Sequence, residues 1–238
     1  MKAKIKMYAW LGGLVGCIAF AGTASAVVID FTGGTAYLEG GGSGATTSGY
    51  ELYDPVDYYI ENGFKLDFIN DNTDQKPKWD VVGDYYGTDE TGNYNDVIHG
   101  HWKTGNYGNL DAIEITQVGG GTFDLNYFIL TSNTDTGGGP ASGNEQTYVE
   151  AWSGGSMTYR QLLPSDDWGW AGPDPQIFLG SEFDSVDMVR FTVDNVVDCF
   201  GMDEFYINEP PPTVPEPGSL ALMALGLIGV AFVKKKTV

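Results

Sequence analysis

Apolar residues along this chain occur in short segments separated by glycine, asparagine and aspartate, and no long stretch has the period of an amphipathic helix. Several segments alternate between apolar and polar side chains. Val189, Phe191 and Val193 share one face of an extended segment, whereas Arg190 and Thr192 point the other way. This period of two predicts strands that have one buried and one solvated face.

Segments of this kind predict the following strands in the middle of the chain: 27–31, 64–69, 97–102, 112–118, 123–131, 146–152, 176–179, 186–193 and 200–207. So many short strands predict an all-β fold, an antiparallel β-sandwich with a jelly-roll-like arrangement. In the segment 123–131, one face is expected to carry Phe123, Leu125, Tyr127 and Ile129. Gly119–Gly121 is expected to form a hairpin turn between two of the strands.

Residues 1–26 have the layout of a secretory signal peptide. Three lysines near the start precede an apolar stretch from Met7 to Ala21, and Ala24-Ser25-Ala26 supplies small residues for cleavage. The mature chain is therefore expected to begin near Val27. One alternative stays open, because Leu14-Val15-Gly16-Cys17 has the pattern of a lipoprotein cleavage box, which would place a lipid on Cys17.

The C-terminus predicts three consecutive segments after a β-sandwich domain at 27–209. Residues 210–217 form a proline-rich linker, 218–233 a transmembrane helix without a charge, and 234–238 a basic tail. A helix of that length spans roughly 24 Å, a little short of a hydrocarbon core of ~30 Å, and its flanking lysines are expected to stay cytoplasmic. A buried core helix is the alternative, which the preceding prolines and the terminal lysines disfavour.

This C-terminus resembles the PEP-CTERM sorting signal of Gram-negative bacteria. The residues that carry the resemblance are the motif Val214, Pro215, Glu216 and Pro217, an apolar helix with Gly226 and Gly229, and the basic cluster Lys234, Lys235 and Lys236. The resemblance implies an exosortase-type membrane protease that cleaves near Pro-Glu-Pro. It also implies a precursor anchored in the inner membrane, followed by the cell surface or the extracellular space. The two prolines keep the motif extended and accessible, and Glu216 is its only charge.

Charge narrows the range of partners. Six of the 12 Lys and Arg residues lie in the two ends, whereas 31 of the 32 Asp and Glu residues lie between them, so the body has a net charge of about −25. This charge disfavours nucleic acid and anionic lipid surfaces as partners, whereas neutral glycans, divalent cations and basic proteins fit. The body holds one cysteine, Cys199, so no internal disulfide forms there. We interpret Cys199 as a small buried hydrophobic residue.

Aromatic residues suggest a binding role. Trp168 and Trp170 lie in DDWGWAGPDP, where flat rings beside carboxylates can stack on a sugar; capping of the sandwich core is the alternative. The order GGGTFDLNYFILTSN, a strand 148–152, VDMVRFTVD and FGMDEFYI also resembles ectodomains found ahead of this anchor, which look like carbohydrate-binding jelly rolls. We therefore expect an ectodomain that binds polysaccharide or extracellular matrix, with a purely structural matrix protein as an alternative.

Catalytic residues do not emerge from the spacing of side chains, and we expect no enzyme. His99 and His101 share one face of a predicted strand and can begin a metal site, but spacing identifies no third ligand, so we interpret them as ordinary half-exposed histidines. Paired carboxylates would serve a secreted glycoside hydrolase, the alternative function. The candidates in or near strands are Glu114, Glu145, Glu150 and Glu204.

Asp30 and Asp203 are predicted to hold a structural calcium ion, Ca2+. They lie in the first and last predicted strands, Asp30 beside Phe31 and Asp203 beside Met202. Terminal strands of a sandwich often lie side by side, and two unpaired acids near apolar packing are costly. A hard cation with oxygen ligands removes that cost. The alternative is that both side chains point to solvent.

Overall fold

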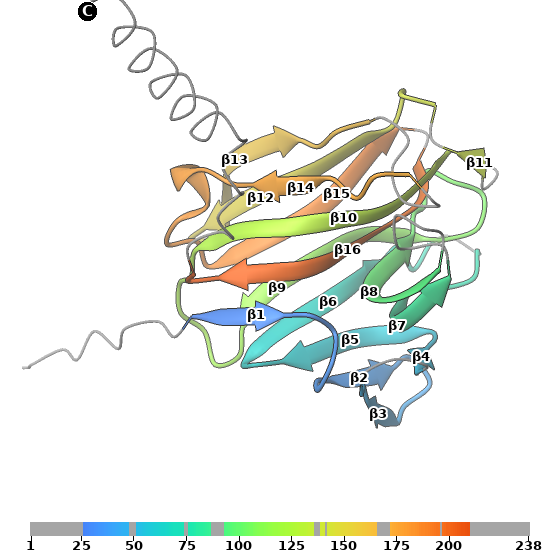
Figure 1. Cartoon of the computed structure of the whole chain (residues 1–238), viewed down its shortest axis with the longest axis horizontal. Helices are drawn as coiled ribbons and strands as arrows, with labels where there is room; N and C mark the ends of the chain where they lie inside the picture. Colours follow the sequence, from blue (N-terminus) through green and yellow to red (C-terminus); the bar gives the residue numbers. More distant parts are fainter. Residues whose placement is uncertain are drawn as a thin grey trace, which may run out of the picture.

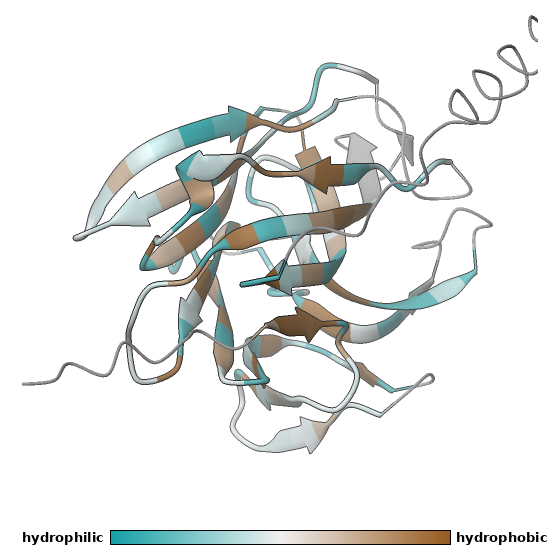
Figure 2. Cartoon of the chain, turned by 60° about the vertical axis from the view of Figure 1, so that its left-hand side comes forward, coloured by the Kyte–Doolittle hydropathy of each residue, from teal (hydrophilic) through white to brown (hydrophobic). Residues whose placement is uncertain are grey.

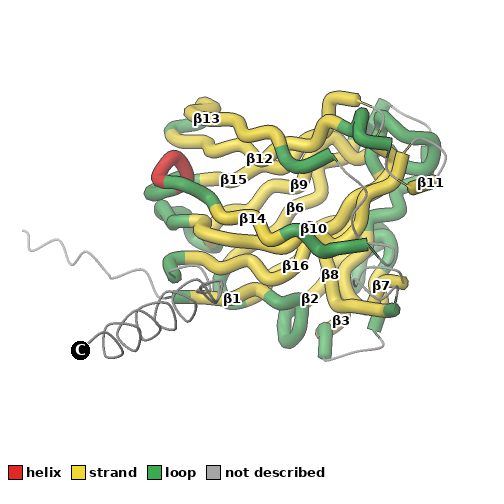
Figure 3. The backbone as a smooth tube through the Cα atoms, turned by 45° about the horizontal axis from the view of Figure 1, so that its top comes forward, coloured by secondary structure: helices red, strands yellow, loops and turns green. Residues whose placement is uncertain are grey.

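The computed structural model describes residues 26–47, 51–73, 76–86, 93–135, 139–140, 142–165, 172–195 and 197–209. Their strands form two antiparallel sheets that face each other (Figure 1). Within these ranges the helical element is a single 3-10 turn, η1 (Ser181–Phe183), which stands out in Figure 3 among strands and loops. The prediction of an all-β antiparallel sandwich is confirmed.

Each sheet is 8-stranded. Sheet A runs in the order β11 (Gly139–Pro140), β10 (Leu125–Asp135), β16 (Val197–Ile207), β8 (Tyr94–His101), β7 (Val81–Tyr86) and β4 (Leu52–Tyr53), while β1 (Val27–Ile29) pairs with β16 and β14 (Gln176–Phe178) with β10. Sheet B runs in the order β13 (Ser156–Leu162), β12 (Gln146–Ser153), β15 (Met188–Asn195), β9 (Leu110–Gln117), β6 (Phe64–Asn70), β5 (Val56–Glu61), β2 (Thr35–Leu38) and β3 (Ser43–Ala45).

The core lies between the inward faces of the two sheets, and Figure 2 shows the alternation of hydropathy along the strands that produces it. Phe128 of β10, Phe191 of β15 and Phe205 of β16 are fully buried. Their ring centroids lie 5.2 Å apart for Phe128 and Phe191 and 5.8 Å apart for Phe191 and Phe205. These three rings join sheet A to sheet B, because β15 belongs to sheet B and the other two strands to sheet A.

Every segment predicted as a strand overlaps a strand of the structure. The prediction of a hairpin turn at Gly119–Gly121, however, is wrong. These glycines, all at positive φ, connect β9 of sheet B to β10 of sheet A. The two edges of β9 are already paired with β6 and β15, so the chain cannot fold back beside β9 and instead crosses to the other sheet. Glycine permits the left-handed backbone that this crossing requires.

The predicted single face of β10 is also wrong beyond Tyr127. Register shifts occur between Leu125 and Tyr127 and again between Tyr127 and Ile129 in the pairing with β16. A bulge of this kind reverses the alternation of side chains. Leu125, on the N-terminal side of the bulge, therefore faces the core. On its C-terminal side the residues that face the core are Phe128 and Leu130, and Ile129 is only half-buried.

Several predictions lie outside the described residues. They concern the signal segment up to residue 25, Trp168 and Trp170, the sorting motif within 210–217, the predicted helix 218–233 and the tail 234–238. In the part of the chain that the structure describes, no helix is long and apolar enough to cross a membrane.

Candidate functional site

The outer face of sheet B carries one row of side chains that runs straight across its strands. In order from β2 to β13, the residues of this row are Tyr37, Tyr58, Asp67, Glu114, Arg190, Glu150 and Arg160, each opposite the next. Residues directly opposite each other in antiparallel strands share a face and interact. We call this set the cross-strand row. It places two of the candidate glutamates, Glu114 and Glu150, on one surface.

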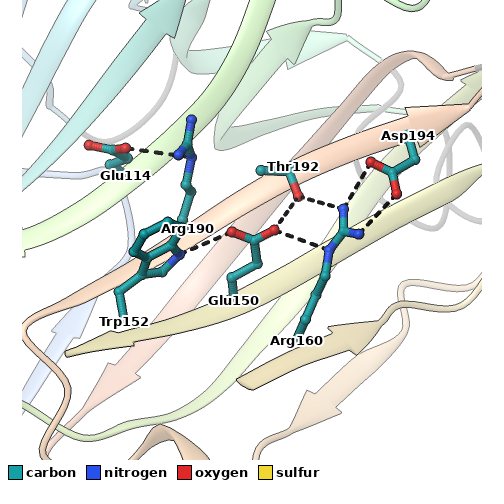
Figure 4. A network of polar contacts seen from close by, with 7 residues as sticks. All are labelled: Glu114, Glu150, Trp152, Arg160, Arg190, Thr192 and Asp194. Atoms are coloured by element: carbon teal, nitrogen blue, oxygen red, sulfur yellow. Dashed lines mark hydrogen bonds and ion pairs between the residues drawn. The ribbon is translucent and has the colours of Figure 1, made fainter. Parts of the chain in front are cut away.

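Glu150 is held by a network of polar contacts at the β13 end of the row (Figure 4). It accepts hydrogen bonds from Trp152 Nε1 at 3.0 Å and Thr192 Oγ1 at 3.1 Å. The Nε of Arg160 lies 3.1 Å from Glu150 Oε1, and the two Nη atoms of Arg160 each donate to Asp194 at 2.9 Å. The bidentate contact fixes the guanidinium plane, since a carboxylate matches its fork geometry.

Glu114 forms an ion pair with Arg190, whose Nε lies 3.5 Å from Glu114 Oε1. Burial raises the pKa of Glu114, and the nearby Arg190 charge lowers it in part. Arg190 thus stands between Glu114 and Glu150 in the row. Both candidate glutamates form ion pairs with arginine. Such pairs are an ordinary way for the polar face of a sheet to neutralise its charges. Hydrolysis by this pair stays a hypothesis.

The other two candidate glutamates lie elsewhere. Glu145 is 1% exposed and accepts hydrogen bonds from the backbone N–H groups of Ser142 at 2.6 Å and Gly143 at 2.8 Å, so it stabilises a turn. Glu204 lies in β16 of sheet A with a positive φ of 48°. The structure therefore brings together Glu114 and Glu150 but neither of the other two.

An exposed pair of aromatic rings lies where two connections between the sheets meet, one from β6 to β7 and one from β8 to β9. Trp79 precedes β7, and Tyr107 lies between β8 and β9; each is 43% exposed. Their ring planes are 16° from parallel, with centroids 6.2 Å apart. We call Trp79 and Tyr107 the ring pair. Sequence reasoning missed it, because the two residues are far apart in the chain and only an aromatic within the glycine-rich stretch GNYGN pointed to Tyr107.

Polar contacts hold the backbone on either side of the ring pair in place. The carbonyl oxygen of Trp79 lies 2.5 Å from His101 Nδ1. Asp198, which is fully buried, accepts a hydrogen bond from the backbone N–H of Tyr107 at 3.3 Å. Lys76 Nζ donates to the carbonyl oxygens of Lys103 and Gly105, both at 2.8 Å, and so ties the two connections together. The backbone that carries the two rings is therefore held in place before any ligand arrives.

Asp203 lies in β16 as predicted, but Asp30 directly follows β1 and does not lie within it. Because β1 pairs with β16, with Ile29 opposite Phe205, the two acids are still brought to neighbouring parts of sheet A. Asp203 is 8% exposed, so the alternative that it points to solvent is wrong for this residue, whereas Asp30 is exposed. Burial raises the pKa of Asp203 to about 8. Hydrogen bonds from Asn95 and from the Glu204 backbone N–H act in the opposite direction and lower that pKa in part.

Further acids surround this pair. The charge of Asp30 raises the pKa values of Asp203, Glu204 and Glu61, after the larger effect of burial in each case. Glu61 is 4% exposed, and burial raises its pKa to about 7. Carboxylate oxygens are the donors that calcium prefers. The acids at the β1–β16 edge thus fit the chemistry of the predicted ion, whose presence stays a prediction.

The two histidines differ from expectation. His99 is fully buried and His101 is 9% exposed, so the prediction of half-exposed side chains is wrong. Burial lowers the pKa of both imidazoles, well below the usual value for His99. Cys199, 5% exposed, lies beside them in β16, which confirms that it is buried. Spacing along the chain could not reveal this neighbour, because β8 and β16 are far apart in the sequence.

Comparison with known proteins identifies the C-terminus. Residues 213–236 match the family described as the PEP-CTERM protein-sorting motif. The match implies that the chain is exported, is processed by exosortase, a membrane enzyme, and is sorted from a membrane-anchored state to the surface or the extracellular space. No curated protein matches the chain.

One solved structure is similar over the sandwich. It is the K1 cleaved adhesin domain of Lys-gingipain (Kgp) from Porphyromonas gingivalis W83. The identity is 14% and the TM-score 0.38, and the similarity covers 77% of this chain and 97% of that chain. A TM-score of this size supports no inference about function.

Proposed function

We propose that this surface-sorted protein is a binding protein whose β-sandwich contacts neutral polysaccharide through the ring pair Trp79 and Tyr107. The sorting motif at 213–236 accounts for its place at the surface. The observation that carries the ligand class is the pair of exposed, nearly parallel rings, at 16° to each other.

The geometry of the ring pair suits a sugar. The apolar C–H face of a pyranose packs against a flat aromatic ring, and polar groups at the rim bind its hydroxyls. Because buried Asp198 and His101 already hold the backbone of both residues, no backbone entropy need be lost there when a ligand binds. A positioned pair of rings is therefore a better platform than two mobile side chains.

Charge favours a neutral glycan over an anionic one. The whole chain has a formal net charge of −20, and its two described arginines are engaged by acids in and beside the cross-strand row. A polyanion would be repelled by this field, whereas a neutral polysaccharide is not. Trp168 and Trp170 stay a second proposed contact, as the sequence predicts.

The test is affinity electrophoresis of the full-length chain in detergent on a panel of neutral and acidic polysaccharides. We expect retardation by a neutral glycan, and a loss of about tenfold in apparent affinity in Trp79→Ala and Tyr107→Ala, because each ring contributes about 1–1.5 kcal/mol. Tyr94→Ala is the matched control, since Tyr94 is 60% exposed and lies at the far end of β8.

Other outcomes separate the alternatives. Unchanged retardation in both ring variants overturns the assignment to Trp79 and Tyr107, and a loss confined to Trp170→Ala moves the site to the second proposed contact. Failure of every glycan to retard the protein favours the structural matrix role. Release of reducing sugar that disappears in Glu114→Gln or Glu150→Gln establishes the hydrolase instead.

A further inference from the structure

We propose that His99, His101 and Cys199 form a binding site for one transition-metal ion, Zn2+ or a copper ion, beneath the ring pair. This proposal goes beyond glycan binding and does not depend on it. The imidazole nitrogens and the sulfur that would serve as ligands all lie within 4.8 Å of one another.

The register of sheet A brings the three side chains together. Cys199 of β16 lies opposite His101 of β8, and Gly201 lies opposite His99. Because residues two apart in a strand share a face, His99, His101 and Cys199 all point to the same side of the sheet. On the opposite side, in the core, Phe200 of β16 stacks on Trp102, the residue that follows β8, with ring centroids 4.7 Å apart.

Small movements of the side chains would complete the coordination. Zinc binds sulfur at about 2.3 Å and imidazole nitrogen at about 2.0–2.1 Å, so ligand atoms around one ion lie roughly 3–4 Å apart. The strands already hold the donors near that range. Nitrogen and thiolate donors in a set of two imidazoles and one sulfur favour zinc or copper over magnesium, calcium or manganese.

A backbone contact selects the form of His101 that can bind a metal. Its Nδ1 lies 2.5 Å from the carbonyl oxygen of Trp79. A carbonyl only accepts hydrogen bonds, so Nδ1 carries the proton and Nε2 of the neutral ring keeps its lone pair. Histidine ligands of metals characteristically donate their second ring N–H to a carbonyl or a carboxylate, which orients the ring.

The His99 ring occupies space that is free because the residue opposite His99 in β16 is a glycine, Gly201. A Cβ at Gly201 would lie 2.9 Å from His99 Nδ1. The Tyr85 ring packs against His99 with centroids 4.4 Å apart, and Trp79 lies edge-on to His101 at 5.8 Å. These rings shield the three donors from water. A site with three protein ligands keeps a fourth position for water or a nearby carboxylate.

The cluster has two alternative roles, a reactive thiol with an imidazole base and plain packing. Two imidazoles converge on one sulfur that is only 5% exposed, which suits a shared ion better than attack on a substrate. Plain packing would bury two imidazoles side by side, where apolar side chains would cost less. The metal site explains all three residues at once.

Binding of the ion is an exchange without a change of oxidation state. The Cys199 thiol releases its proton to the buffer as the sulfur–metal bond forms, and the neutral imidazoles bind through their lone pairs. One proton is therefore released for each ion bound.

The experiment titrates the full-length chain in detergent, reduced and stripped of metal, with Co2+ and then Zn2+ as probes. A Cys17→Ala background makes Cys199 the only thiol. We expect one equivalent of Co2+ to bind with a sulfur-to-metal absorption band, displacement of that band by Zn2+, release of about one proton per ion, and protection of Cys199 from a thiol reagent.

Variants distinguish this site from a merely structural cluster. Cys199→Ala and His101→Gln are expected to abolish the band and to weaken Zn2+ binding by tenfold or more, on the order of the effects known at metal sites. Phe200→Leu is the control, because Phe200 neighbours Cys199 but faces the core. A chain that binds no Co2+ overturns the proposal. So does a band that survives in Cys199→Ala, or a thiol that reacts equally fast with and without metal.

Discussion

Arg160 lies over the ring of Tyr148, with its Cζ 3.6 Å from the ring centroid, while both Nη atoms reach Asp194. One side chain from the edge strand β13 thereby joins a cation–π contact, a bidentate carboxylate contact and the ion pair with Glu150. Each contact alone is weak on a surface. Because all three contacts are made by the same side chain, the conformational entropy of that side chain is lost only once for the three of them. The cross-strand row is therefore anchored at its β13 end.

Substitution of this arginine should measure the network. We expect Arg160→Ala to lower the free energy of unfolding in urea by about 1–2 kcal/mol, and Arg160→Lys to lower it by roughly half as much, because lysine keeps the charge but loses the planar fork. Arg190→Ala is the comparison, since its ion pair with Glu114 is longer, at 3.5 Å. An equal effect of the two alanine variants would contradict the special role of Arg160.

Asp203 predicts a pH dependence of stability. Its pKa rises from the ordinary 3.8 to about 8 in the folded chain. The folded state therefore binds this proton more tightly, so the contribution to stability is complete below pH 3.8 and is lost as the pH rises through 8. Urea midpoints should fall across that window and fall less steeply in Asp203→Asn. Glu61→Gln should remove a separate part of the pH dependence of stability, the part that comes from Glu61 and is lost as the pH rises through about 7. If the urea midpoints of both variants depend on pH as steeply as those of the wild type, the assignment to Asp203 and Glu61 is wrong.

Calcium should act on the same acids. We propose, as the sequence predicts, that an ion held partly by Asp30 and Asp203 stabilises the β1–β16 edge. Millimolar calcium is expected to raise the melting temperature of the full-length chain above pH 8, and chelator to reverse the rise, with little effect in Asp203→Asn. Magnesium at the same concentration is the control. An unchanged midpoint in the wild type removes the site.

Sorting predicts the mature termini. Intact mass of surface or culture-fluid protein should begin near Val27 and stop near Pro217. Glu216→Ala should leave precursor in the membrane, because it removes the only charge within the proline segment. Glu209→Ala, just before the linker, is the matched control. Exported protein that keeps its full C-terminus would contradict processing at the motif.

The sequence alone determined the class of fold and the destination of the chain. Alternation such as that of Val189, Phe191 and Val193 depends only on neighbours along one strand, and those residues are buried as predicted. The sorting motif is likewise contiguous, so a segment of the chain suffices to recognise it. Edge strand β13 escaped this reasoning, because most of its side chains are exposed and leave no apolar face to detect.

Only the tertiary structure decided which strands are neighbours and in what register. Glycines that suit a hairpin at Gly119–Gly121 serve a crossing between sheets, since β9 has no free edge. The meeting of Trp79 with Tyr107, and of His99 and His101 with Cys199, depends on pairings between segments far apart in the chain. Local pattern specifies the face on which a side chain lies, but a shift of one residue in pairing changes every partner across the sheet. For that reason the candidate sites became visible only when the strands were placed side by side.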